Sequence, residues 1–110
     1  MQIADLSAAA LDYWVARAEG LSPVITYEDG KAECRVESSA YSPSSDWSQG
    51  GRLIERHRIM VAWNADHWIA GANAPLDDAR DRIWLGRTAL IAAMRAHVAS
   101  VFGDEVSGQA

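Results

Sequence analysis

The sequence contains one cysteine, three prolines and one phenylalanine among its 110 residues. Because Cys34 stands alone, no disulfide can form within the chain, a pattern typical of reducing compartments. No stretch reaches the roughly 18 apolar residues that a membrane span requires. The first residues also lack the basic and apolar regions of a signal peptide. These absences predict a cytoplasmic protein that is neither exported nor inserted into a membrane.

Basic residues are scarce as well. Ten Lys and Arg residues stand against fifteen Asp and Glu residues, which gives a net charge of −5. Because binding to the phosphate backbone depends on Lys and Arg, nucleic acid is disfavoured as a partner. Apolar residues make up 49% of the chain, which is close to the globular average, and the length is that of one domain. We predict a single compact domain over residues 1–103 and a flexible tail over residues 104–110.

The motifs that would identify an enzyme are missing too. The sequence has neither the glycine-rich P-loop pattern nor the pattern of dinucleotide-binding folds, and no nucleophile elbow. Its histidines, His57, His67 and His97, do not follow the spacing of metal ligands in zinc sites. We therefore predict no catalytic residues, no metal and no cofactor, and an enzyme is the least favoured class.

Two segments have the pattern of amphipathic helices, over residues 8–19 and 89–102. In both, apolar residues recur at the three- and four-residue intervals that form one helix face. Ser7 and Thr88 immediately precede them and suit the N-cap position. Gly20 suits the left-handed conformation in which helices commonly end. These are the two clearest elements in the sequence.

Four short segments between the helices are typical of strands. Residues 24–27 and 32–36 flank a turn that contains Gly30, and residues 58–63 and 67–70 flank a second turn-prone segment. Two hairpins between two helices indicate the α+β class. We predict a small antiparallel sheet of about four strands, covered by the N-terminal and C-terminal helices, and leave the order of the strands open.

Residues 41–52 combine turn-forming residues, two aromatics, an acid and an arginine. A structural interpretation explains most of them as one capped helical turn. Ser42 would be the cap, Trp47 would fill the core, and Gly50 would end the turn and let the chain reverse. We give this interpretation the greater weight, because such residues shape loops more often than they bind ligands.

The same segment also suits a binding site. Tyr41 and Trp47 offer faces for stacking a planar group, while the amides of Gly50 and Gly51 and the side chain of Arg52 suit an anion. These parts predict a nucleotide-like ligand, although the same aromatics would also suit a protein partner. The candidate binding residues are Tyr41, Ser42, Ser44, Asp46, Trp47, Gly50, Gly51 and Arg52.

One more tryptophan stands out among the five in the chain. Trp84 follows a charged segment and has no apolar pattern around it, unlike Trp14 and Trp63. Aromatic residues are enriched at protein interfaces, so Trp84 is a candidate interface anchor. A homo-oligomer is compatible with this prediction.

Four blocks of the sequence are ALDYWVARAEG (residues 10–20), YSPSSDWSQGG (41–51), IER (54–56) and LIAAMRAHVASVFGDE (90–105). In these blocks the chain resembles the NinX-like family of small phage and prophage proteins of uncharacterised function. Together they cover about half of the chain, in order. The resemblance implies a protein encoded by a phage or prophage that acts in the cytoplasm of the bacterial host. It implies no particular chemistry.

The chain departs from the family pattern at two positions. Such proteins often have proline after the glycine pair and at the start of the last helix, where this chain has Arg52 and Ala89. Anion binding through Arg52 is therefore a feature of this sequence and not of the family. We expect a non-catalytic protein that binds a host or phage protein. The alternative is a small nucleotide-like ligand bound at residues 41–52.

Overall fold

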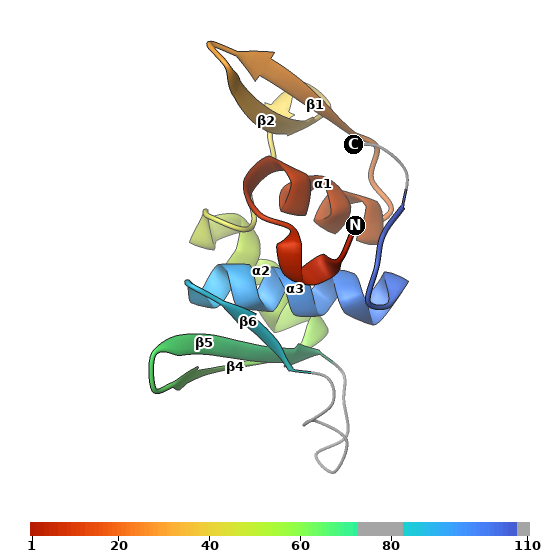
Figure 1. The fold of residues 1–110 in the computed structure, drawn as a ribbon. Coiled ribbons are helices and arrows are strands. Elements are labelled where there is room, and N and C mark those ends of the chain that lie inside the picture. The colour runs from red at the N-terminus through yellow and green to blue at the C-terminus, as the bar shows by residue number, and fades with distance from the viewer. Residues whose placement is uncertain (73–82, 108–110) are drawn as a thin grey trace.

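In the computed structural model, which describes residues 1–72 and 83–107, three α-helices lie between two small antiparallel sheets (Figure 1). The predicted α+β class is confirmed. One sheet lies above helix α1 in Figure 1, and the other lies below helices α2 and α3. In chain order the elements are the 3₁₀ helix η1 (Ile3–Asp5), α1 (Ala8–Ala18), β1 (Pro23–Glu28), β2 (Lys31–Val36), β3 (Ser39–Ala40), α2 (Trp47–His57), β4 (Ile59–Asn64), β5 (His67–Ala72), β6 (Trp84–Gly86) and α3 (Ala89–Phe102).

Helix α1 confirms the helix predicted over residues 8–19 to within one residue. Leu6 and Leu11, on either side of its first turn, are both fully buried, as expected when two such residues pack across a helix start. Gly20 has a φ of 80°, a conformation that glycine adopts at no steric cost. The helix therefore ends with Glu19 at its C-cap.

The first sheet consists of β1, β2 and the short β3, in that order. Strands β1 and β2 form a hairpin in which Glu28 pairs with Lys31. The two residues between them, Asp29 and Gly30, both have positive φ, as a tight hairpin turn requires. Most side chains of this sheet are exposed, whereas Cys34 is buried in the core. The sheet therefore contributes few residues to the core.

The second sheet consists of β4, β5 and β6, and all three strands contact α3. The prediction of one sheet is wrong in this respect, because the two predicted hairpins belong to different sheets. Helices α1 and α3 pack against each other between them, so the hairpins cannot pair. Each hairpin is instead completed by a short third strand that the sequence pattern did not reveal.

Helix α3 is the central element, and its bounds match the prediction. Its N-terminus is capped by Thr88, whose Oγ1 accepts a hydrogen bond from the N–H of Ile91 at 3.1 Å. The many alanines of α3 permit close packing. A Cβ atom at Gly86 would lie 2.5 Å from the backbone nitrogen of Ala92, so β6 can approach the helix only because residue 86 is glycine.

The two ends of the described chain meet on one side of α3. Gln2 and Glu105 form an isolated antiparallel bridge, and the amino group of Met1 donates to the carbonyl of Val106 at 2.7 Å. Val106 is only 5% exposed. The segment predicted as a flexible tail, residues 104–110, is therefore held by the N-terminus as far as Val106, because a buried valine and a backbone pair fix it.

Candidate functional site

The segment predicted as the site is a turn followed by a helix of three turns. The N–H groups of Ser45 and Asp46 both donate to the carbonyl of Ser42, at 3.1 and 2.9 Å, so the predicted turn at Ser42 is confirmed. Asp46 then caps α2, because its Oδ1 accepts a hydrogen bond from the N–H of Ser48 at 2.9 Å. The side-chain amide of Gln49 reaches the other carboxylate oxygen of Asp46 at 3.1 Å.

The prediction that Gly50 ends this turn is wrong, since α2 continues to His57. A Cβ atom on Gly50 would lie 2.3 Å from the carbonyl oxygen of Pro43 and 2.6 Å from Cδ2 of Leu90. The glycine is needed for this close packing and not for a chain reversal. Because Gly50 and Gly51 lie inside the helix, their amides are not grouped into the anion-binding loop that we predicted.

Trp47 does not fill the core, as the structural interpretation required. Its side chain is 60% exposed at the first position of α2. The helix starts one residue after Asp46, and this start turns position 47 outward. The prediction of a core tryptophan here is wrong, because the ring lies on the surface.

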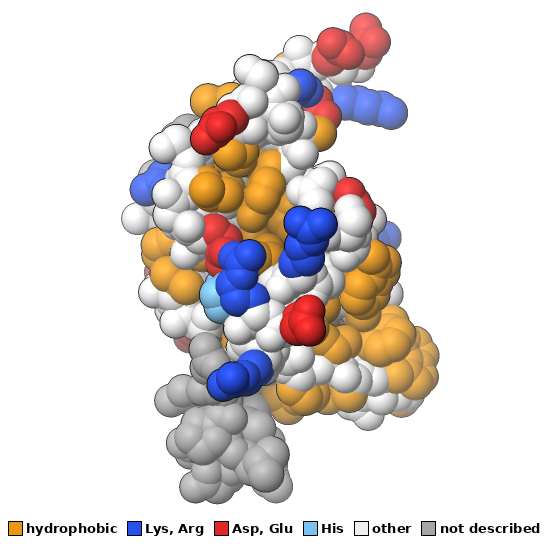
Figure 2. Space-filling model, turned by 180° about the vertical axis from the view of Figure 1, so that it is seen from behind, with side chains coloured by type: hydrophobic (Ala, Val, Ile, Leu, Met, Phe, Trp, Pro, Cys, Tyr) orange, Lys and Arg blue, Asp and Glu red, His pale blue; other side chains and the backbone are white. Residues whose placement is uncertain are grey.

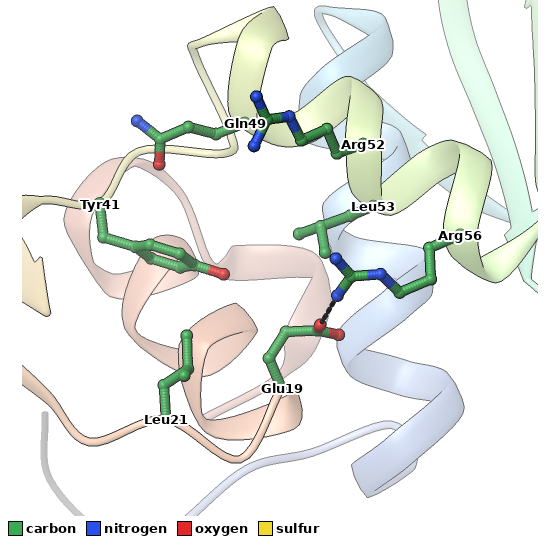
Figure 3. Close-up of a pocket in the computed structure, with 7 residues that line it drawn as sticks. All are labelled: Glu19, Leu21, Tyr41, Gln49, Arg52, Leu53 and Arg56. Atoms are coloured by element: carbon green, nitrogen blue, oxygen red, sulfur yellow. Dashed lines mark hydrogen bonds and ion pairs between the residues drawn. The ribbon is translucent and has the colours of Figure 1, made fainter.

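Tyr41 and Arg52 meet at a hollow between the end of α1 and one face of α2 (Figure 3). We call it the α1–α2 hollow, and its volume is about 290 Å³. In Figure 3 the ring of Tyr41 and the side chain of Leu53 point into the hollow, and the side chain of Arg52 lies beside Gln49 at the rim of the hollow. The residues that line the hollow are Glu19, Leu21, Tyr41, Gln49, Arg52, Leu53 and Arg56.

The other predicted site residues lie elsewhere. Ser42 and Ser44 line a second cavity of about 370 Å³, together with Asp12 and Cys34. Trp84 is half-buried on β6 and packs against the core. The structure thus divides the predicted binding residues. Arg52 lines the α1–α2 hollow, Ser42 and Ser44 line the second cavity, and Tyr41 lines both. Trp47 is exposed on α2, whereas Gly50 is buried inside the packing of that helix. The interface role of Trp84 stays a prediction.

A buried carboxylate anchors the turn beside the second cavity. Asp12 is 4% exposed, and its Oδ1 accepts a hydrogen bond from the N–H of Ser44 at 2.8 Å. Burial raises the pKa of Asp12 to about 6, and the hydrogen bonds from Ser44 only partly offset this rise. Burial also raises the pKa of the Cys34 thiol to about 11, so this thiol stays protonated at neutral pH.

A second carboxylate joins three helices beside the α1–α2 hollow. Glu19 accepts hydrogen bonds from Arg56 to Oε1 at 2.9 Å, and from Nε2 of His57 and Nε2 of His97 to Oε2 at 2.8 and 2.7 Å. The two imidazole rings stack with their centroids 4.2 Å apart. We call these four residues the Glu19 cluster.

The charges of the Glu19 cluster follow from its contacts. Burial raises the pKa of Glu19, but hydrogen bonds from His97 and His57 outweigh this effect and leave the pKa below its usual value. Burial lowers the pKa of His97. Both shifts favour an ionised carboxylate beside a neutral imidazole. Because an ionised carboxylate only accepts, the Nε2 atoms carry the hydrogens.

No local sequence pattern reveals the Glu19 cluster. Glu19 lies 38 residues before His57 and 78 residues before His97, so no local spacing connects them. Three ligand atoms, one from each of these residues, lie within 4.8 Å of one another, a group that could hold a metal ion. Only the packing of three helix segments brings these groups together. The one local signal was the position of Glu19 immediately before the glycine at the end of α1.

The fold is that of a small α+β protein, and two arginines are among the residues that line the α1–α2 hollow. The family model described as Bacteriophage P22, NinX matches residues 2–101, and the chain belongs to this family. No curated protein matches the chain. Within the described residues, no helix is long and apolar enough to cross a membrane.

Proposed function

We propose that the protein is a non-catalytic binding protein of the phage-infected host cytoplasm whose α1–α2 hollow takes a small anionic ligand with a planar group. One observation carries this proposal. Arg52 and Arg56 lie one turn apart on α2, and both line the hollow that the ring of Tyr41 enters (Figure 3). Cations beside an aromatic face are the parts that recognise a nucleotide-like molecule.

Charge supports an anion at this place. Arg52 is exposed, and among the described residues its guanidinium has neither a hydrogen bond nor an ion pair. Arg56 pairs with Glu19 but is still 62% exposed. On the face shown in Figure 2, basic side chains flank apolar side chains in a hollowed region. A local excess of positive charge on an acidic protein favours a small anion over an extended polyanion.

Tyr41 supports a planar and partly apolar ligand. Burial and, to a lesser degree, the nearby Glu19 carboxylate raise the pKa of its hydroxyl to about 12, so the phenol stays neutral and can donate a hydrogen bond. Leu21 and Leu53 provide apolar walls, whereas the side-chain amide of Gln49 is held by Ser42 and Asp46. The volume of about 290 Å³ is near the lower limit for small-molecule sites. A mononucleotide matches this combination.

Calorimetric titration of the protein with adenosine 5′-monophosphate tests the proposal, with inorganic phosphate in a parallel titration. We expect weak, saturable binding of the mononucleotide that falls at least about tenfold in Arg52→Ala, since a charged hydrogen bond of about 1.5–3 kcal/mol is lost. Lys31→Ala removes the same charge from an exposed position at the start of β2 and should leave the affinity unchanged. Equal losses in both variants, or no heat with any ligand, would contradict a site at the hollow.

A protein partner is the second candidate, and the exposed tryptophans favour it. Trp47 is 60% exposed and Trp63 is 56% exposed, and the ring of Trp63 stands edge-on to that of Trp68. Figure 2 shows apolar side chains gathered over the lower part of the molecule. Exposed aromatic groups of this kind are typical anchors of protein interfaces. Affinity purification from infected cells with the natural chain and with Trp47→Ala would reveal a partner that depends on this residue.

A further inference from the structure

The Glu19 cluster gathers three metal-ligating side chains from three helix segments. Glu19 is the C-cap of α1, His57 is the last residue of α2, and His97 lies inside α3. Their side chains are 10%, 28% and 3% exposed, so the group is largely shielded from water. The proposed anionic ligand does not account for the two imidazoles, which do not line the hollow.

We propose that Glu19, His57 and His97 form a binding site for a divalent transition-metal ion, with Zn²⁺ the best match. Two imidazole nitrogens and one carboxylate oxygen are a ligand set that zinc prefers. Three protein ligands leave the fourth tetrahedral position to water. The set excludes Ca²⁺ and Mg²⁺ as preferred ions, because these take mainly oxygen ligands.

The distances allow such an ion with small side-chain movements. Both Nε2 atoms already converge on Oε2 of Glu19, at 2.8 and 2.7 Å, and all three ligand atoms lie within 4.8 Å of one another. With zinc–ligand bonds of about 2.0–2.1 Å, the ligand atoms of a tetrahedral site stand roughly 3.3 Å apart. The carboxylate and the imidazoles therefore have to shift to bring their ligand atoms to this spacing. Each neutral imidazole binds the ion in its other tautomer, so its hydrogen on Nε2 is exchanged through water for one on Nδ1.

Two further features determine how tightly the site would bind a metal ion. Arg56 holds Oε1 of Glu19 at 2.9 Å and so orients Oε2 toward the imidazoles, as outer partners do in metal sites. Nδ1 of His97 is buried and has no partner among the described residues. With the metal on Nε2, this Nδ1 would carry an unpaired hydrogen, which should weaken the affinity by about tenfold relative to a fully supported site.

The test is a titration of chelator-treated protein with Zn²⁺ alone, followed by calorimetry, and a parallel titration with Co²⁺, followed by visible absorption. We expect one equivalent of zinc, and cobalt bands of a four-coordinate ion. His57→Ala should weaken zinc binding at least about tenfold and abolish those bands. Because the His57 side chain is partly exposed, this variant should still fold, which circular dichroism checks. Glu19→Gln serves as the second ligand variant.

The chain provides a matched control in His67. At the start of β5 its Nδ1 lies 2.6 Å from Oδ1 of Asp66, so it is a similar histidine–carboxylate pair with no third ligand among the described residues. His67→Ala should bind zinc as the natural chain does, and so should Arg52→Ala, which tests the proposed ligand of the hollow separately. Zinc affinity that is unchanged in both His57→Ala and Glu19→Gln, or no binding by the natural chain, would overturn the proposal.

Discussion

Asp12 in α1 and Glu19 at the C-cap of this helix are seven residues apart on one face of the helix, yet their surroundings differ. Asp12 is buried and accepts a backbone N–H from Ser44, and its pKa is raised. Glu19 has three cationic or imidazole partners, and its pKa is lowered despite burial. Burial alone therefore does not decide the charge of a carboxylate here. The kind of hydrogen-bond donor that faces the carboxylate decides its charge.

The position of each carboxylate on the helix adds to this difference. Glu19 is at the C-terminal end of α1, where the helix dipole disfavours a negative charge. Arg56 and the two histidines compensate for this position. Asp12 is in the middle of the helix, where the dipole has little effect, and it depends on hydrogen bonds alone.

Both carboxylates act on the same neighbouring segment. Asp12 holds the turn that leads into α2 through Ser44, and Glu19 holds the end of α2 through Arg56 and His57. Helix α1 thus fixes both ends of the segment from Ser44 to His57. The α1–α2 hollow lies between these two attachments, which explains how a small protein keeps an open depression next to its core.

The same isosteric exchange at the two carboxylates should have opposite effects at neutral pH. Asp12→Asn keeps an oxygen for the N–H of Ser44 but removes a buried charge. The pKa of Asp12 rises from 3.8 to about 6 on folding, which at 1.36 kcal/mol per unit corresponds to about 3 kcal/mol. Because the pKa of Asp12 is higher in the folded protein than in the unfolded chain, the protonated carboxyl contributes this energy to the free energy of unfolding in full below pH 4. The contribution is lost as the pH rises through 6.

The free energy of urea unfolding, measured from pH 4 to pH 8 with chelator present, checks this prediction. Asp12→Asn should be the more stable protein at pH 8, and the difference from the natural chain should shrink to near zero at pH 4. Glu19→Gln should instead cost about 1–2 kcal/mol at pH 8, because it weakens charged hydrogen bonds. Parallel pH profiles for Asp12→Asn and the natural chain would show that this carboxylate does not titrate as its burial implies.

The packing of α2 between its two attachments can be tested at adjacent glycines. A Cβ atom at Gly50 would contact the carbonyl of Pro43 at 2.3 Å, whereas one at Gly51 would meet only the Trp47 ring at 3.6 Å. We expect Gly50→Ala to destabilise the protein by about 1–3 kcal/mol through overpacking. Gly51→Ala should stabilise it by about 0.5–1 kcal/mol, because alanine is the better helix former.

Thermal unfolding of the two alanine variants under identical conditions gives the measurement. The sign of the shift should differ between them. If both variants melt at the same temperature as the natural chain, then α2 does not lie as close to residues 43 and 90 as the structure places it.

Local pattern predicted α1 and α3 well, because caps and apolar stripes are encoded within a few residues, but it predicted only one turn where α2 has three. Ser7 and Thr88 stand at the N-cap positions of α1 and α3, and Gly20 follows the C-cap of α1, where we expected them, although the side chain of Ser7 makes no cap hydrogen bond. The candidate site could be predicted only in part. Tyr41 and Arg52 do share a hollow, but the Glu19 cluster depends on contacts between residues 38 and 78 positions apart.

Gly50 and Trp47 show why the local sequence pattern did not predict the structure of residues 41–52. A Gly-Gly pair usually signals a break, whereas here the close approach of Pro43 and Leu90 explains why the residue at position 50 of the helix is glycine. Trp47 was assigned to the core because a large apolar side chain gains most from burial. Its direction depends on which residue starts the helix, and a shift of one position rotates a side chain by about 100°.

The smallest expected effect concerns this tryptophan. Since 60% of the Trp47 side chain is exposed, Trp47→Ala should change the free energy of unfolding by less than about 1 kcal/mol. The matched variant Trp14→Ala, at a position 7% exposed, should cost about 3–5 kcal/mol. Urea unfolding of both variants checks the contrast. A large loss in Trp47→Ala would mean that the ring is covered in solution, and a second copy of the chain or a partner protein would then be the covering surface to look for.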